Sequence, residues 1–233
     1  MNKEIIGYIK FVDEKYVTTF DCLSSLWLSS IDVFTKEPES SKNNLIDDRY
    51  EGRLKDLVLN MPAFITCFTE LENDNFEKDG TLKEKFSKLL LENEEQLGKN
   101  RKFIFIPTQN MSHLLQTLDS ANRADTKEGV LNDTEFFSRK IEYCKNYEDK
   151  MKALEDDFFA GNVSKEKLAS KMLATKDSKY SAQNEFRIGI VLPCKKEDVA
   201  SDHISLKITS PFPFATKSFE KSQLKTLNTQ ELK

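Results

Sequence analysis

The sequence predicts an α+β fold in which helices are inserted into a mixed, mainly antiparallel sheet. Two observations lead to this prediction. Strand-like runs cluster towards both ends of the chain and helix-like runs lie between them. No regular alternation of strand and helix is present, so a doubly wound parallel sheet is not expected. With 233 residues, the chain is long enough to bury a core without disulfides or a structural metal.

The composition is that of a globular protein. Charged residues make up 32% of the chain and hydrophobic residues 38%, with 7 Gly, 6 Pro and 17 Phe. These proportions exclude collagen-like and largely disordered proteins. The net charge of −4 argues against a protein that coats nucleic acid through charge alone, although a local basic groove is compatible with it. No stretch approaches 18 apolar residues, so no membrane partner is expected.

The cysteines favour a reducing compartment. The four cysteines are Cys22, Cys67, Cys144 and Cys194, which are far apart and form no CxxC pair. With only His113 and His203 available as histidine ligands, no metal site is expected. The N-terminus lacks the apolar segment of a signal peptide. Reduced thiols and the missing signal peptide together predict a cytoplasmic protein.

In the first third of the chain, short apolar runs alternate with polar segments. Residues 5–11 (IIGYIKF) and 26–28 (LWL) read as strands, and 63–68 (AFITCF) is a clearer one because it is β-branched and aromatic. The polar segment 35–48 is expected to be a mobile loop. Residues 50–60 fit either a strand or a short helix, because their apolar positions follow neither period.

Helical periodicity dominates the middle of the chain. Helices are predicted over 82–97, 110–118, 146–159 and 165–173, with a turn at Gly161-Asn162 between the last two. Strands are predicted over 102–106, which Pro107 stops, and over 139–144.

The last part of the chain carries the strongest strand pattern, at 185–192 (EFRIGIVL) and 203–208 (HISLKI). No linker rich in Gly, Ser and Pro divides the chain, so residues 1–218 are predicted to form one domain. The tail, 219–233, is polar and is expected to fray.

One pair of residues could carry chemistry. The motifs GxGxxG, GxxxxGK[ST], HExxH and GxSxG are all absent, which removes most phosphate-loop, zinc and serine-hydrolase interpretations. Gln183 and Glu185 stand just before a strongly apolar strand, where residues at i and i+2 point the same way. An amide can hold an acceptor group while a carboxylate orients a ribose or supports a developing positive charge. The alternative, which spacing alone favours, is a pair of exposed strand-edge residues with Glu185 paired to Arg187 or a lysine.

Two further features have a functional and a structural interpretation each. Ser29 and Ser30 end an apolar strand and could line a ligand pocket, although ordinary turn chemistry is the simpler interpretation. The single Trp27 before them is typical of a core residue. In the acidic segment 47–52 (DDRYEG), Arg49 and Tyr50 could face a substrate or belong to a solvated charge run, and the two interpretations weigh equally.

Taken in order, four segments resemble a family. LWLSSIDVF, DDRYEG, ITCFTE and KDSKYSAQNEFRIGI look like the motifs of a widespread group of bacterial proteins associated with phage defence, including abortive infection. The match is spread over most of residues 5–192. This layout in turn resembles the ADP-ribosyltransferase fold, including the DarT-like toxins. That fold has a basic or histidine residue on its first strand, Ser or Tyr on its second, and a [Gln/Glu]-x-Glu turn before a late strand.

The resemblance implies an NAD-dependent ADP-ribosyltransferase with Glu185 as the catalytic glutamate and Gln183 as the acceptor-orienting residue. The implied NAD-binding residues are Lys10, Trp27, Ser29, Ser30, Arg49 and Tyr50. The segment IIGYIKF departs from the pattern, because it contains no Arg or His. Lys10, or Arg49 or Arg53 from the next motif, would then supply the cation.

The implied partners follow from the Gln-x-Glu form of the turn. In the transferases this form tends to accompany amide or nucleobase acceptors, so the acceptor would be RNA, DNA or a protein amide. The setting would be a toxin of an anti-phage or toxin–antitoxin system, with an antitoxin as its partner. The alternative is a non-catalytic antitoxin or phage sensor on a degenerate version of the same fold.

Overall fold

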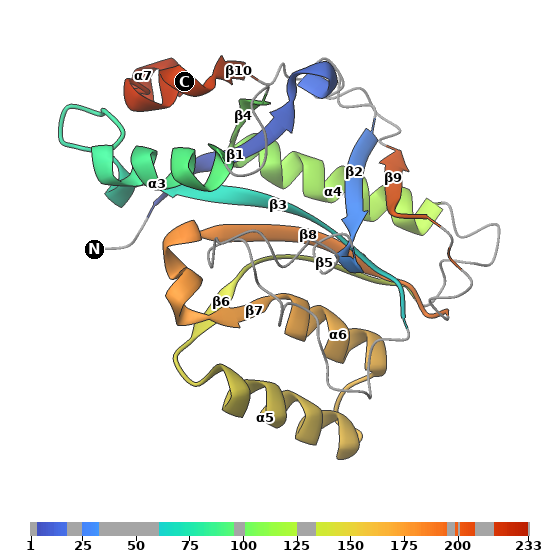
Figure 1. The fold of residues 1–233 in the computed structure, drawn as a ribbon. Coiled ribbons are helices and arrows are strands. Elements are labelled where there is room, and N and C mark those ends of the chain that lie inside the picture. The colour runs from blue at the N-terminus through green and yellow to red at the C-terminus, as the bar shows by residue number, and fades with distance from the viewer. Residues whose placement is uncertain are drawn as a thin grey trace. The chain divides into compact units, whose positions relative to one another are not determined.

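The computed structural model describes residues 4–17, 25–32, 61–95, 101–124, 134–194, 199, 201–207 and 217–232 (Figure 1). The chain forms two compact units. Unit 1 consists of Met1–Leu26, Phe68–Ala121 and Lys207–Lys233, and unit 2 of Trp27–Cys67 and Asn122–Leu206. The described strands pair mainly in antiparallel fashion and several helices lie between them in sequence, which confirms the α+β class.

Unit 1 contains antiparallel strands in the hydrogen-bonding order β10, β4, β1 and the second half of β3. Their bounds are β1 Ile5–Asp13, β3 Ala63–Glu72, β4 Arg101–Pro107 and β10 Lys217–Glu220. The described α-helices of this unit are α3 (Glu84–Glu95), α4 (Thr108–Ala124) and α7 (Thr229–Leu232). Its 3-10 helices are η1 (Glu14–Tyr16), η2 (Asn73–Asn75) and η6 (Lys221–Lys225). The register places Ile9 opposite Phe105 and Tyr8 opposite Glu70.

The core of unit 1 joins segments that are distant in the sequence. Its buried members are Ile9, Leu71, Phe76, Leu82, Leu90, Phe103, Phe105, Leu224, Leu227 and Leu232. The last three come from the C-terminal tail, and Phe219 of β10 stacks on Phe103 with ring centroids 5.0 Å apart. The prediction that this tail frays is therefore wrong. The leucines of the tail belong to the unit 1 core, and β10 pairs with the edge of β4. The sequence did not predict this because polar residues separate these leucines.

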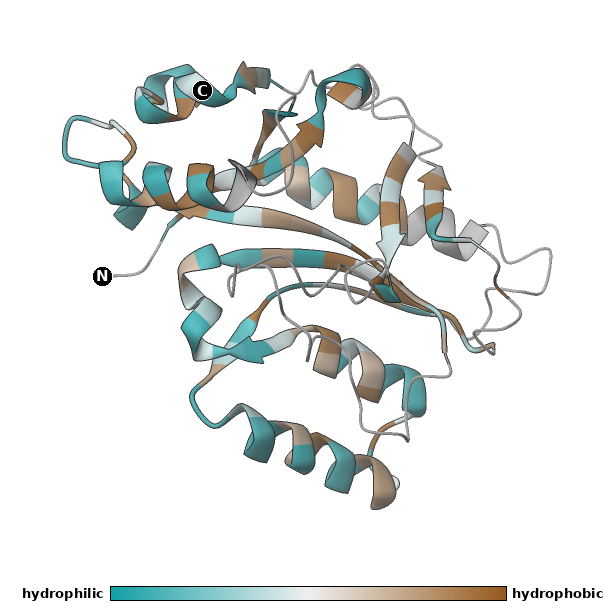
Figure 2. Ribbon diagram, viewed as in Figure 1, coloured by the Kyte–Doolittle hydropathy of each residue, from teal (hydrophilic) through white to brown (hydrophobic). Residues whose placement is uncertain are grey.

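In unit 2, β8 (Glu185–Val191) pairs with β5 (Glu135–Lys140) and with β3, and β2 (Ser25–Ser30) joins β3 to β9 (His203–Lys207). Two short strands, β6 (Glu142–Cys144) and β7 (Thr175–Asp177), pair in parallel. The helix α6 (Lys165–Leu173) lies between α5 (Tyr147–Phe159) and the β5–β8 pair (Figure 1). Because α6 is sandwiched, five of its residues are buried, whereas α5 buries one and carries polar residues along most of its length (Figure 2).

Every residue of β8 is buried. Gly189 of this strand has no room for a side chain, because a Cβ there would lie 2.4 Å from the Phe137 ring and 3.1 Å from Ile65. The strand that carries Glu185 is thus packed tightly from both neighbouring strands. A rigid strand is a suitable support for a functional side chain.

Most predicted elements are confirmed with shifted ends. The helix predicted at 110–118 extends over 108–124, and the turn between α5 and α6 contains Gly161 with a φ of +76°. The single strand predicted at 139–144 is wrong. This range covers the end of β5 and all of β6, which are two separate strands. They are interrupted at the buried Ile141, whose N–H donates to the Glu185 carbonyl oxygen at 2.9 Å. The segments 35–48 and 50–60 lie outside the described residues. None of the described helices is long and apolar enough to cross a membrane.

Candidate functional site

Gln183 and Glu185 lie on different elements of unit 2, on either side of one residue with unusual backbone geometry. Gln183 ends the 3-10 helix η4 (Ser178–Gln183), and Glu185 opens β8. Asn184 between them adopts a left-handed conformation with a φ of +45°, which asparagine tolerates better than most residues. The chain therefore turns sharply at Asn184. Gln183 near the turn and Glu185 on the strand are the positions that the sequence predicted. The two side chains are however brought together by the turn at Asn184, and not by the alternation of side chains along a strand.

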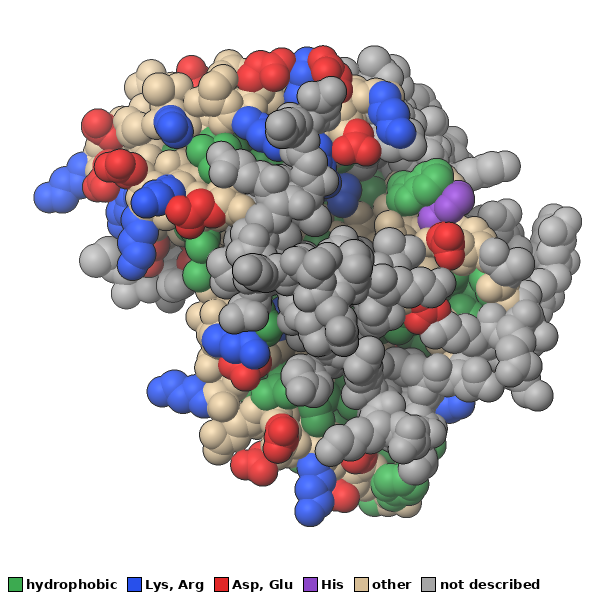
Figure 3. All heavy atoms as spheres, viewed as in Figure 1, with side chains coloured by type: hydrophobic (Ala, Val, Ile, Leu, Met, Phe, Trp, Pro, Cys, Tyr) green, Lys and Arg blue, Asp and Glu red, His purple; other side chains and the backbone are tan. Residues whose placement is uncertain are grey.

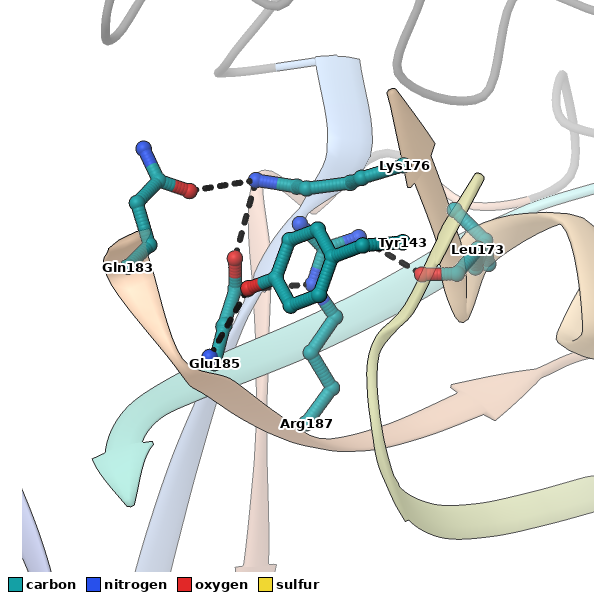
Figure 4. A network of polar contacts seen from close by, with 6 residues as sticks. All are labelled: Tyr143, Leu173, Lys176, Gln183, Glu185 and Arg187. Atoms are coloured by element: carbon teal, nitrogen blue, oxygen red, sulfur yellow. Dashed lines mark hydrogen bonds and ion pairs between the residues drawn. The ribbon is translucent and has the colours of Figure 1, made fainter. Parts of the chain in front are cut away.

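The two side chains meet at one ammonium group, that of Lys176 in β7. Lys176 Nζ lies 2.8 Å from Glu185 Oε2 and donates to Gln183 Oε1 at 3.2 Å (Figure 4). The same ammonium lies 5.7 Å from the centroid of the Tyr180 ring. The lysine, the amide and the carboxylate thus form one continuous polar network.

Arg187 completes the network from the other side of the carboxylate. Its Nε donates to Glu185 Oε1, and its NH1 donates to the carbonyl oxygen of Leu173 at 2.6 Å. Arg187 is 1% exposed, Lys176 6% and Glu185 7%, so the three charges are shielded from solvent. A buried charge is tolerated when it is paired and hydrogen-bonded. These contacts meet that condition for Glu185.

Tyr143 of β6 holds the backbone at the same point. Its phenol oxygen accepts a hydrogen bond from the Glu185 N–H at 2.9 Å (Figure 4). Burial, and to a smaller extent the negative charge of Glu185, raise the pKa of Tyr143, so its phenol stays neutral at physiological pH. The first residue of β8 is thereby fixed through both its side chain and its backbone.

The alternative to a functional pair was an exposed strand edge on which Glu185 pairs with Arg187 or a lysine, and the structure bears out only part of it. Glu185 does pair with Arg187 and with a lysine. The pair is however not an exposed strand edge, because Glu185 is buried and Gln183 is half-buried. Glu185 is therefore a buried carboxylate that belongs to a hydrogen-bonded polar network.

Trp27 and the two serines lie on β2, away from this network. Trp27 is 47% exposed and stacks on His203 with ring centroids 3.6 Å apart, so its expected core position is wrong. Ser30 Oγ accepts from the Asp32 N–H at 3.3 Å, which is the turn chemistry given as the simpler interpretation. Ser29 lies opposite Ile65, a residue that packs against Gly189. Gly189 is about 13 Å along β8 from Glu185, so the structure does not bring the serines into contact with the pair.

The other predicted site residues are Lys10, Arg49 and Tyr50, with Arg53 as an alternative source of the cation. Lys10 belongs to β1 in unit 1, where its ammonium lies 5.1 Å from the centroid of the Phe68 ring. Arg49, Tyr50 and Arg53 lie outside the described residues.

The structure adds residues that the sequence argument did not assign. Lys176 stands in the motif KDSKYSAQNEFRIGI, four residues before Tyr180, so the motif itself was a signal for it. Tyr143 had no such signal, because it lies 42 residues before the N–H group that it binds. Only the pairing of β6 with β7 brings Tyr143 to this site.

Comparisons with protein-family models, with curated proteins and with solved structures found no match to this chain. Among the described residues, His, Cys, Asp and Glu side chains form no group that could hold a metal ion.

Proposed function

We propose that this chain is an ADP-ribosyltransferase that uses NAD as its substrate, working in the cytoplasm as a toxin of an anti-phage or toxin–antitoxin system. The observation that supports this proposal best is the meeting of Gln183 and Glu185 at one ammonium group, at the start of the buried strand β8. An amide and a carboxylate at a turn that leads into a late strand match the arrangement implied by the resemblance.

The proposed reaction breaks the bond between nicotinamide and ribose C1′. The bonding electron pair leaves with nicotinamide, whose ring becomes neutral, and positive charge develops on the ribose, as in glycoside cleavage. A lone pair of the acceptor then bonds to C1′ and the acceptor loses a proton to solvent. Glu185 would accept a hydrogen bond from the ribose 2′-hydroxyl and stabilise the developing charge.

The contacts of Glu185 are compatible with this role. A carboxylate offers about four acceptor positions on its two oxygens. In the structure, one oxygen contacts Lys176 and the other contacts Arg187. The side chain retains 9% exposure, so a hydroxyl group can be accepted without breaking either ion pair.

The acceptor in this proposal is a nucleic-acid base or a protein amide, which Gln183 would orient. Figure 3 shows that acidic and basic side chains of the described residues are interspersed on the face in view. This mixed surface and the net charge of −4 favour recognition through local contacts over general attraction to a polyanion.

A second candidate is a non-catalytic binding protein, such as an antitoxin or phage sensor, on a degenerate version of the same fold. The observation that favours it is the pairing of both Glu185 oxygens with cations. Two positive charges offset the negative potential that a cationic transition state needs. In this case the network would serve to hold η4, β7 and β8 together.

The test is nicotinamide release together with labelling from NAD that carries the label in its adenylate phosphate, in separate pools of RNA, DNA and protein. We expect the wild type to label one pool. Glu185→Gln, which removes the charge, and Glu185→Asp, which keeps it but moves it, should both lose about 100-fold or more of the activity. The aspartate variant guards against misfolding, because it leaves neither Lys176 nor Arg187 without an anion.

Glu142→Gln is the matched control. Glu142 is an exposed carboxylate on β6 whose side chain contacts Lys150 at 2.8 Å and Cys144 rather than Glu185, so its replacement should leave activity unchanged. Wild-type activity in a folded Glu185 variant would contradict the proposal. If the wild type labels no pool and releases no nicotinamide, the non-catalytic candidate is supported instead.

A further inference from the structure

We propose that Lys176 is a positioning residue that aligns Glu185 and Gln183 together, so that the site is a unit of three residues. This inference rests on the proposed function, since it assigns a role within the same site. It concerns a residue that the comparison with the transferase pattern leaves without a role.

Burying the Lys176 ammonium costs free energy of desolvation, so its position calls for an explanation. Lysine is almost never fully buried, yet Lys176 is only 6% exposed, on a strand of three residues. Replacing buried ion pairs by apolar residues of similar volume often leaves stability unchanged or improves it. A gain in stability alone therefore does not explain a lysine at this position, whereas control over the geometry of Gln183 and Glu185 does.

Lys176 determines which end of the Gln183 amide faces which way. An ammonium group can only donate, so the amide must present its oxygen to it, as the contact at 3.2 Å shows. Figure 4 shows the amide nitrogen of Gln183 on the side away from Lys176. The same ammonium holds Glu185 Oε2 at 2.8 Å. One group thus sets the direction of the amide and of the carboxylate at the same time.

A neighbouring lysine provides a matched control. Lys179 also lies over the Tyr180 ring, at 4.8 Å from its centroid. Lys179 is exposed, whereas Lys176 is buried and contacts both the Gln183 amide and the Glu185 carboxylate. Lys176→Met and Lys179→Met therefore each remove a lysine charge beside the same ring, and Lys176→Met also removes the ammonium that contacts the pair.

The experiment measures kcat and KM for nicotinamide release. In Lys176→Met we expect kcat to fall on the order of 10-fold or more with little change in KM, because the reacting groups lose alignment while substrate binding is retained. Lys176→Arg restores donors to the site and should recover part of the loss, although its planar guanidinium has a different geometry. Lys179→Met should match the wild type.

Folding is checked by circular dichroism and urea unfolding for each variant. If Lys176→Met does not fold, Lys176→Gln takes its place, because its side chain lacks the charge and ends one atom short of the lysine ammonium. Wild-type kcat in either folded variant overturns the inference. An equal loss in Lys176→Met and Lys179→Met also overturns it, because a general effect of charge would then explain both.

Failure of the proposed function has a separate signature, namely a wild type that releases no nicotinamide. In that case a double-mutant cycle of Lys176→Met with Gln183→Leu, read by urea unfolding, tests the positioning alone. Non-additive free energies of unfolding, set against an additive cycle for Lys179→Met with Gln183→Leu, support it. Additivity in both cycles overturns it.

Discussion

At the scale of single residues, the amide of Gln183 offers the sharpest test of the proposed function. Its oxygen accepts a hydrogen bond from Lys176, and in the proposed function its nitrogen would donate one to the acceptor. An amide nitrogen only donates, and it matches a carbonyl oxygen or a ring nitrogen of a base, or the oxygen of a protein amide.

Gln183→Glu isolates that donor. The carboxylate can still accept from Lys176, so we expect nicotinamide release to stay within about threefold of the wild type. Transfer to the acceptor should fall on the order of 10-fold or more, because the donor is lost and a charge is added. The paired measurement is nicotinamide release and acceptor labelling on the same samples. If both fall equally, Gln183 serves NAD binding or folding and the acceptor role is wrong.

At the scale of elements, the polar network around Glu185 depends on two short elements, the strand β7 and the 3-10 helix η4. β7 has three residues and contributes Lys176, and η4 brings Gln183 beside β8. Asp177, at the junction of the two, caps η4 by accepting from the Lys179 N–H at 2.9 Å. Such elements have no periodic pattern of their own, because their stability comes from tertiary contacts.

The C-terminal segment is a second element whose importance lies in its packing. Leu224 of η6 is fully buried in the core of unit 1. We expect Leu224→Ala to lower the free energy of unfolding by about 2–5 kcal/mol, as for other buried leucines. Urea unfolding is the measurement, and Lys225→Ala on the same 3-10 helix is the control, with a change within about 0.5 kcal/mol. If the two variants are equally stable, Leu224 does not stabilise the core and the tail is frayed, as the sequence predicted.

At the scale of the whole molecule, buried titratable groups determine how stability depends on pH. Tyr8 of β1 is 6% exposed and lies opposite Glu70 of β3, which is 2% exposed. Burial, with a contribution from the charge of Glu70, raises the pKa of Tyr8 to about 12, against an ordinary value of 10.0. The folded chain therefore resists losing this proton.

This shift predicts a loss of stability in alkali. Below pH 10 the phenol is protonated in both the folded and the unfolded chain, and its contribution is fully present. Between pH 10 and about 12 only the folded chain keeps the proton, so the free energy of unfolding should fall, by about 2 kcal/mol over this window. Urea midpoints across this range should fall less steeply for Tyr8→Phe than for the wild type. Parallel curves would show that Tyr8 does not titrate in this range.

The sequence by itself determined the fold class, the principal helices and strands, and the pair Gln183 and Glu185. These features depend on patterns within about 20 neighbouring residues, such as the spacing of apolar residues along α3, α5 and α6. A periodic apolar face can be buried in only a few ways, and such a pattern therefore predicts its element even without knowledge of the rest of the chain.

Only the tertiary structure decided what surrounds that pair and where the tail goes. Tyr143 binds the Glu185 backbone 42 residues later in the chain. The Leu227 carbonyl oxygen accepts a hydrogen bond from the N–H of Leu82, which is still more distant in sequence. Lys176 lies within the segment KDSKYSAQNEFRIGI, but its contacts with Gln183 and Glu185 depend on the turn at Asn184, which brings both side chains to its ammonium. Contacts of this kind depend on which strands pair and in which register. That choice is made by burial over the whole chain, because no short segment can bury its own apolar surface.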